Sequence, residues 1–241
     1  MKALLLAIAT LAAEPCAAQF AVTDVQQAVA IEGHLQAVDS LTGALQQADA
    51  ADARSAPPLQ VGMSLALPEG RADAQGRASL ELMSADRVLS FAALADVDTV
   101  GHGDGMLVLS GFGQATVDLR LHFTLAQAQT VHLAMDSSVT HERGEDFAFR
   151  LARDDGTPLW RETSVLDGTG SPSRAFDRAL FLDAGGYEIV ASLDAASRFD
   201  DAHGYAGRTA ATVSLSLVPE PASVALLIAG LAALALCRRR P

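Results

Sequence analysis

Apolar and polar residues alternate with a period of two along much of the chain, the pattern of strands with one buried face. Between residues 117 and 125, apolar side chains occupy every odd position, with Asp118, Arg120 and His122 among the residues opposite. The same alternation recurs at 61–67, 131–135, 147–151, 187–193 and 213–217. Turn residues such as Asp155-Gly156 and Gly185-Gly186 separate these stretches. The pattern predicts a mainly β fold, an antiparallel β-sandwich or jelly roll.

Residues 20–55 have a different spacing. Their larger apolar residues recur at intervals of three and four, which favours one or two helices or a helical hairpin, although Gly33 and Gly43 interrupt the pattern. The Pro57-Pro58 pair then marks a boundary. We therefore expect an N-terminal segment at 19–56, of which 20–55 is the helical candidate, and a β-sandwich domain at 57–217.

The first 18 residues have the pattern of a secretory signal peptide. One positive charge at Lys2 precedes an apolar run too short to span a bilayer, and small residues follow it. Cleavage by signal peptidase is predicted between Ala18 and Gln19. Acylation of Cys16 is disfavoured because Glu14-Pro15 precedes it where small residues are needed.

The C-terminal segment predicts one transmembrane helix at 222–237. This uncharged run would span roughly 24 Å, a little less than a ~30 Å hydrocarbon core. Arg238, Arg239 and Arg240 follow directly and would stop transfer, leaving the C-terminus in the cytoplasm and the middle of the chain outside. Both ends of the chain therefore predict export.

The tail also resembles a known family signature. Val218-Pro219-Glu220-Pro221, an Ala- and Leu-rich helix and a terminal arginine cluster are similar to the PEP-CTERM sorting domain of Gram-negative bacteria. The resemblance covers residues 218–241 and implies processing by a membrane-embedded exosortase near Pro219, Glu220 and Pro221. It further implies transient residence in the inner membrane, then release or transfer to the cell surface or extracellular matrix, in association with exopolysaccharide or biofilm.

The composition limits the classes of partner that this chain is expected to bind. The chain has 17 basic and 29 acidic side chains, for a formal charge of −12, which argues against nucleic-acid binding. The span from Gln19 to Pro221 would carry 13 basic and 28 acidic side chains. That excess favours solubility and contact with acidic polymers through divalent ions. Both cysteines, Cys16 and Cys237, lie in the targeting segments, so no disulfide framework is expected.

One segment is a candidate cation site. Asp96, Asp98 and Asp104 lie in a stretch rich in Asp and Gly that could supply oxygens to calcium, or could equally be a solvated turn between strands. It is not an EF-hand, because Val100 and Leu107 occupy two ligand positions. No other cofactor is expected.

No catalytic motif is complete. His141-Glu142-Arg143-Gly144-Glu145 lacks the second histidine of a zinc protease helix, and there is no serine elbow. Trp160 with Tyr187 or Tyr205 would suit a sugar-stacking platform, but core packing is favoured for these rings.

The region from Leu121 to Leu193 resembles bacterial β-sandwich modules of the prepeptidase C-terminal type, which supports the fold class alone. We expect a non-enzymatic structural or adhesive protein. The alternatives are a calcium-assisted carbohydrate-binding module and, less favoured, a divergent hydrolase.

Overall fold

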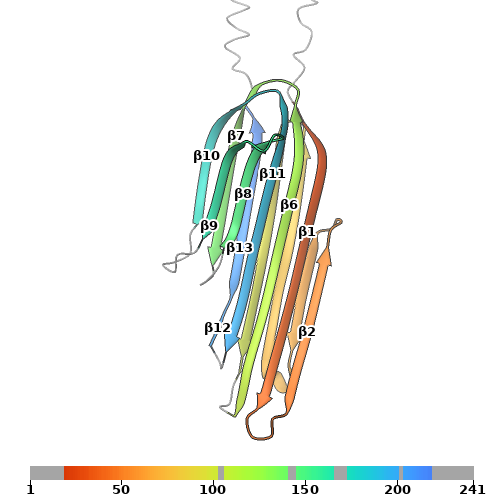
Figure 1. The fold of residues 1–241 in the computed structure, drawn as a ribbon, viewed down its shortest axis with the longest axis vertical. Coiled ribbons are helices and arrows are strands. Elements are labelled where there is room, and N and C mark those ends of the chain that lie inside the picture. Colours follow the sequence, from red (N-terminus) through yellow and green to blue (C-terminus); the bar gives the residue numbers. More distant parts are fainter. Residues whose placement is uncertain (1–18, 103–105, 141–144, 166–172, 201–202, 219–241) are drawn as a thin grey trace, which may run out of the picture.

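The alternating segments form long strands in two antiparallel sheets that pack face to face (Figure 1). The computed structural model describes residues 19–102, 106–140, 145–165, 173–200 and 203–218. This architecture confirms the expected mainly β sandwich. The predicted signal peptide and transmembrane helix lie outside the described residues. Within the described ranges, no helix is both long and apolar enough to cross a membrane.

The first sheet, sheet A, has the order β2-β1-β6-β11-β8-β9, and a short strand β12 pairs with β11. Its strands are β1 (Phe20–Asp39), β2 (Leu45–Arg54), β6 (Leu107–Leu125), β8 (Glu145–Arg153), β9 (Pro158–Val165), β11 (Gly185–Asp200) and β12 (His203–Tyr205).

Sheet B has the order β10-β7-β13-β5-β4-β3. Its strands are β3 (Gln60–Ala66), β4 (Ala72–Ala85), β5 (Val88–Gly101), β7 (Gln129–Thr140), β10 (Ser173–Leu182) and β13 (Gly207–Leu217), with a 3-10 turn at Pro68–Gly70 before β4.

The helical prediction for residues 20–55 is wrong, because this segment forms β1 and β2. From Val29 to Ala37 the odd-numbered side chains face the core, as the burial of Ile31 and Leu35 shows. Gly33 occupies one of these inward positions, where a Cβ would come within 2.5 Å of the Met63 sulfur. A glycine at an inward position hides the period of two, so the larger residues alone suggest a helix. The sandwich therefore begins at Phe20.

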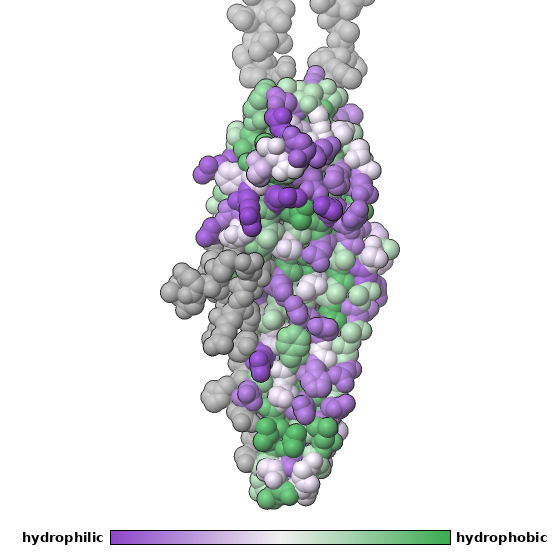
Figure 2. Space-filling model, viewed as in Figure 1, coloured by the Kyte–Doolittle hydropathy of each residue, from purple (hydrophilic) through white to green (hydrophobic). Residues whose placement is uncertain are grey.

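The core changes character along the long axis. At the end where β1 begins, large rings fill it: Phe123 lies with its ring centroid 5.4 Å from both Phe20 and Tyr187. Toward the other end, alanines line much of the interior, namely Ala72, Ala74, Ala95, Ala115 and Ala195, and one buried ring, Phe199, lies against Gly101 and Gly111. Two buried hydroxyls, of Thr99 and Ser197, meet there at 2.6 Å. The molecule narrows toward this end (Figure 2).

The described chain starts and finishes at the same end of the sandwich (Figure 1). The Phe20 amide donates to the Asp86 carbonyl at 3.0 Å, and the Leu217 amide donates to the Arg87 carbonyl at 2.9 Å. Asp86 and Arg87 form the turn between β4 and β5. We call this region, with Val218, the exit end. The opposite end, made by the β1–β2 turn and the start of β6, is called the distal tip.

Candidate functional site

The last described residue is bound tightly into the fold at the exit end. The Val218 amide donates to the Thr130 carbonyl at 3.0 Å, and the Val218 carbonyl accepts from Nε2 of Gln129 at 3.1 Å. Because β13 also lies between β5 and β7, its end is paired on both sides. The folded part therefore extends to the residue directly before Pro219.

The predicted sorting and processing residues border the described fold. Pro219, Glu220, Pro221 and the arginines at 238–240 lie outside the described residues, as does Ala18. Gln19 is the first described residue and is exposed, whereas Phe20 is buried beneath the β4–β5 turn. The predicted cut between Ala18 and Gln19 would therefore leave every described core residue in place.

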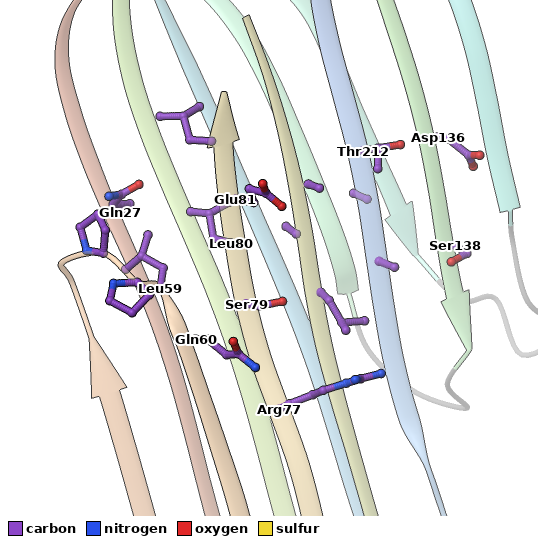
Figure 3. A pocket seen from close by; sticks show the side chains of 18 residues that line it. Gln27, Leu59, Gln60, Arg77, Ser79, Leu80, Glu81, Asp136, Ser138 and Thr212 are labelled. Carbon is purple, nitrogen blue, oxygen red and sulfur yellow. The ribbon is translucent and has the colours of Figure 1, made fainter. Parts of the chain in front are cut away.

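A shallow groove of about 850 Å³ crosses the outer face of sheet B (Figure 3). Its floor is made of small side chains on β5 and β13, including Ala92, Ala210 and Thr212. Glu81 on β4 and Asp136 on β7 lie at its two sides, because register places both in one cross-strand row with Ala92 and Thr212 between them. The groove thus presents hydroxyl and carboxylate oxygens over a flat floor.

The spacing of the two groove carboxylates limits their chemistry. Glu81 and Asp136 are separated by three strand intervals, which is about 14 Å at ~4.8 Å per interval. Paired carboxylates of glycoside hydrolases lie roughly 5–9.5 Å apart. The two groups are therefore suited to bind different parts of an extended ligand rather than to flank one bond. Sequence reasoning missed both residues, because nothing in the sequence aligns two strands 55 positions apart.

A second polar cluster lies on the outer face of sheet A. Glu188 on β11 is buried, and its carboxylate accepts from Nε of Arg120 at 2.6 Å and from the guanidinium of Arg150. Nε2 of His122 lies 3.6 Å from the same carboxylate. One acid thus holds two arginines from β6 and β8, an arrangement that ties three strands together. Arg120 and His122 are visible in the sequence as polar strand positions, but their partner is 66 or more residues away.

One tyrosine and one aspartate in the strands that carry this cluster have raised pKa values. Burial raises the pKa of Tyr187, whose hydroxyl donates to the Asp183 carbonyl at 2.7 Å. Desolvation likewise raises the pKa of Asp118, which lies two residues before Arg120 on β6.

The predicted calcium ligands are not brought together among the described residues. Asp96 and Asp98 lie within strand β5 rather than on a loop, and Asp104 lies outside the described residues. Asp96 is 3.4 Å from Nε of Arg77. The described part of the chain contains no cluster of three His, Cys, Asp or Glu side chains able to hold a metal.

The two aromatic residues considered for sugar stacking pack elsewhere. Tyr187 is 2% exposed and stacks on Phe123. The Trp160 ring lies 5.0 Å from the Phe176 ring and beneath the guanidinium of Arg178. Tyr187 therefore packs in the core, Trp160 is partly buried against it, and the side chain of Tyr205 lies outside those described.

The described residues form an antiparallel two-sheet sandwich in which the start of β1 and the end of β13 lie at the same end of the molecule. The family model described as the PEP-CTERM protein-sorting motif matches residues 217–240. The chain therefore carries a C-terminal PEP-CTERM sorting motif, which begins at the last residue of β13. The motif implies an exported precursor that is anchored in the membrane before exosortase processing. The resemblance to prepeptidase C-terminal-type modules is not confirmed.

Other comparisons add little. No curated protein matches the sequence. Among solved structures, an isomalto-dextranase of Arthrobacter globiformis T6 in complex with panose is similar at 10% identity and a TM-score of 0.25, over 82% of this chain and 34% of that chain. A structure of infectious bursal disease virus, Gx strain, is similar at 12% identity and a TM-score of 0.27, over 87% and 59%. This chain thus spans less than two thirds of either, and TM-scores this low carry no argument about function.

Proposed function

We propose that this chain is a non-enzymatic structural or adhesive protein of the cell surface or extracellular matrix, delivered by exosortase processing to an exopolysaccharide or biofilm. The observation that carries the proposal is that the first and last strands of the fold meet at the exit end. Two membrane-directed segments, at 1–18 and 222–237, would leave the fold side by side, because Phe20 and Leu217 bond to neighbouring residues of one turn. A sandwich held by one end presents both outer faces and its distal tip away from the membrane.

The absence of an enzymatic role is part of this proposal. It is supported by the wide spacing of Glu81 and Asp136 and by the use of Glu188 as a structural ligand of two arginines. In our proposal the C-terminus of the precursor stays in the cytoplasm, held there by Arg238–Arg240. Signal peptidase acts first and exosortase second.

The test is the intact mass of the protein released by an exosortase-containing host. We expect a mature form that begins at Gln19 and lacks Arg238–Arg240. A host without the exosortase should accumulate a membrane-bound precursor, and so should a variant with Pro219→Ala and Pro221→Ala. A released form that keeps the arginine cluster would contradict exosortase processing.

A carbohydrate-binding module is the second candidate, favoured by the sheet B groove. Its floor is flat and its sides carry Glu81, Asp136, Ser79 and Ser138, groups that hydrogen-bond sugar hydroxyls. A glycan array with and without calcium tests it, with the double variant Glu81→Gln and Asp136→Asn as the matched control. Binding that this variant abolishes supports the module, and a blank array under both conditions contradicts it.

A further inference from the structure

The first residue that the structure describes, Gln19, is an exposed glutamine in front of a strand that is held firmly in place. Directly after it, Phe20 is 6% exposed, and its ring packs edge-on against the Phe123 ring. The Phe20 amide donates to the Asp86 carbonyl at 3.0 Å, which fixes the backbone on the C-terminal side of Gln19. The packed fold therefore begins at Phe20, and Gln19 lies just outside it at the exit end.

The side chain of Gln19 is not used by the fold. No hydrogen bond or ion pair joins it to another described residue. Other carboxamides are used: Nε2 of Gln129 donates to the Val218 carbonyl at 3.1 Å, and Nε2 of Gln114 donates to Asp194 at 2.8 Å. A side chain without such a bond keeps its choice of rotamers, so the carboxamide of Gln19 can turn toward its own backbone nitrogen.

We propose that Gln19, as the N-terminal residue of the exported chain, closes to a pyroglutamate lactam. This inference rests on the proposed function, in which signal peptidase cuts between Ala18 and Gln19. The cut turns the backbone nitrogen of Gln19 from an amide nitrogen into a free α-amine. Only the amine is nucleophilic enough to attack a carboxamide, so the modification follows export and does not occur in the precursor.

The reaction takes place within one residue and balances without a co-reactant. The neutral α-amine attacks Cδ of the Gln19 side chain, and the new N–Cδ bond closes a five-membered ring. The bond from Cδ to Nε2 breaks, and Nε2 leaves as ammonia with one proton from the α-nitrogen. Nothing is oxidised or reduced. The fold does not have to move, because the hydrogen bond to the Asp86 carbonyl uses the next backbone nitrogen, that of Phe20.

The lactam changes the end of the chain and leaves the fold as it is. It has no ammonium group, so the mature protein loses its α-amino charge, as it would by N-terminal acetylation. Aminopeptidases need that free amine, so they cannot trim the chain toward β1. The pairing of β1 with β6, which starts at Phe20 and Leu125, is thereby protected from digestion outside the cell.

The experiment uses the full chain, exported by a Gram-negative host that contains an exosortase. A protease that cuts before aspartate releases residues 19–23 as a short peptide, because Asp24 is the first aspartate after the predicted cut. Its mass should be lower by one ammonia, about 17 Da, than that of the unmodified peptide. Gln26 and Gln27, in the next peptide, should keep their amides. An isotope-labelled synthetic copy of residues 19–23, added before digestion, measures cyclisation during the work-up.

The matched variant is Gln19→Asn, which keeps a carboxamide on a side chain one methylene shorter. Its lactam would be a strained four-membered ring, so this variant should keep an open amine that an aminopeptidase removes. The wild type should resist the aminopeptidase and lose its first residue only to a pyroglutamyl peptidase. The melting temperatures of the two proteins should agree, because the bond from Phe20 to Asp86 is present in both.

The identity and the mass of the first residue separate this inference from the proposed function. An N-terminal Gln19 that stays open after prolonged incubation at neutral pH overturns cyclisation and leaves the predicted cut intact. A chain that begins at another residue, such as Phe20, overturns cyclisation and also counts against the maturation in the proposed function. Loss of ammonia from both the wild type and Gln19→Asn would place the change at another residue and overturn the inference as well.

Discussion

Single carboxylates shape the turns of this protein. Asp39 accepts two backbone amides at the distal tip, and Asp155 accepts the Thr157 amide at 2.8 Å in the turn before β9. These hydrogen bonds favour the ionised form, so the pKa of each carboxyl lies below its usual value of 3.8. Both positions are recognisable in the sequence as turn residues, because Asp bonds its own backbone two residues on.

The lowered pKa of Asp39 predicts a dependence of stability on acid. A folded-state pKa below the unfolded value contributes stability above about pH 3.8, and this contribution is lost as pH falls through the folded-state pKa. At pH 7, Asp39→Ala should therefore melt at a lower temperature than the wild type, and the difference should shrink as pH falls below 3.8. Thermal melting across pH measures it, with Asp52→Asn on β2 as a control. A gap between wild type and variant that is constant across pH would contradict the prediction.

At the scale of elements, strands from distant parts of the sequence depend on a few close contacts. Glu188 joins β6, β8 and β11 through Arg120 and Arg150, and Phe199 of β11 lies over Gly101 of β5 and Gly111 of β6. The alternation of polar and apolar residues within one strand predicts neither contact. Each contact depends on the register between strands that are far apart in the sequence.

Removing the charge of Glu188 should weaken sheet A. In Glu188→Gln the two arginines lose the negative charge that they share and repel one another, with an expected cost of about 1–3 kcal/mol in the free energy of unfolding. Denaturant unfolding measures this cost, and added salt should recover part of it by screening the repulsion.

The matched control for Glu188→Gln is Asp118→Asn on the same outer face. Desolvation raises the pKa of Asp118, so its ionisation opposes folding, and stability falls as pH rises above about 3.8 toward the folded-state pKa. At pH 7 this variant should be as stable as the wild type or more so. Equal destabilisation by both substitutions would contradict the role assigned to Glu188.

The contact of Phe199 predicts a sharp difference between two glycines. A Cβ at Gly111 would lie 2.0 Å from Cε1 of Phe199, whereas at Gly62 the nearest atom is 3.8 Å away. Gly111→Ala should therefore cost about 1–3 kcal/mol through overpacking, and Gly62→Ala should change stability little. Denaturant unfolding of both variants checks this, and Phe199→Leu in the Gly111→Ala background should restore part of the loss.

At the scale of the whole molecule, the fold brings the first and last described residues to the same end, and Val218, the last of them, is still hydrogen-bonded into the fold. The matched family region starts at Leu217, which is still part of β13, and Val218 is bonded to Gln129 and Thr130. A processing enzyme that needs extended substrate on the N-terminal side of Pro219 must compete with these hydrogen bonds.

A flexible Gly-Ser linker between Val218 and Pro219 should therefore speed processing severalfold. Pulse-chase conversion of precursor to released protein in an exosortase-containing host measures the rate. The same linker inserted at Gly43, in the β1–β2 turn at the distal tip, is the control and should leave the rate unchanged. An unchanged rate with the linker before Pro219 would show that the end of β13 does not restrict the enzyme.

The sequence by itself determined the β class and the sorting signal, because both are local: side chains alternate every two residues along a strand, and the motif is one contiguous run. The helical prediction for 20–55 failed because Gly33 takes an inward position, which the Met63 and Leu65 side chains of the facing sheet explain. Tertiary structure alone decided which residues share a surface. Glu81 with Asp136 and Glu188 with Arg120 meet through register between strands, which depends on the packing of the entire core.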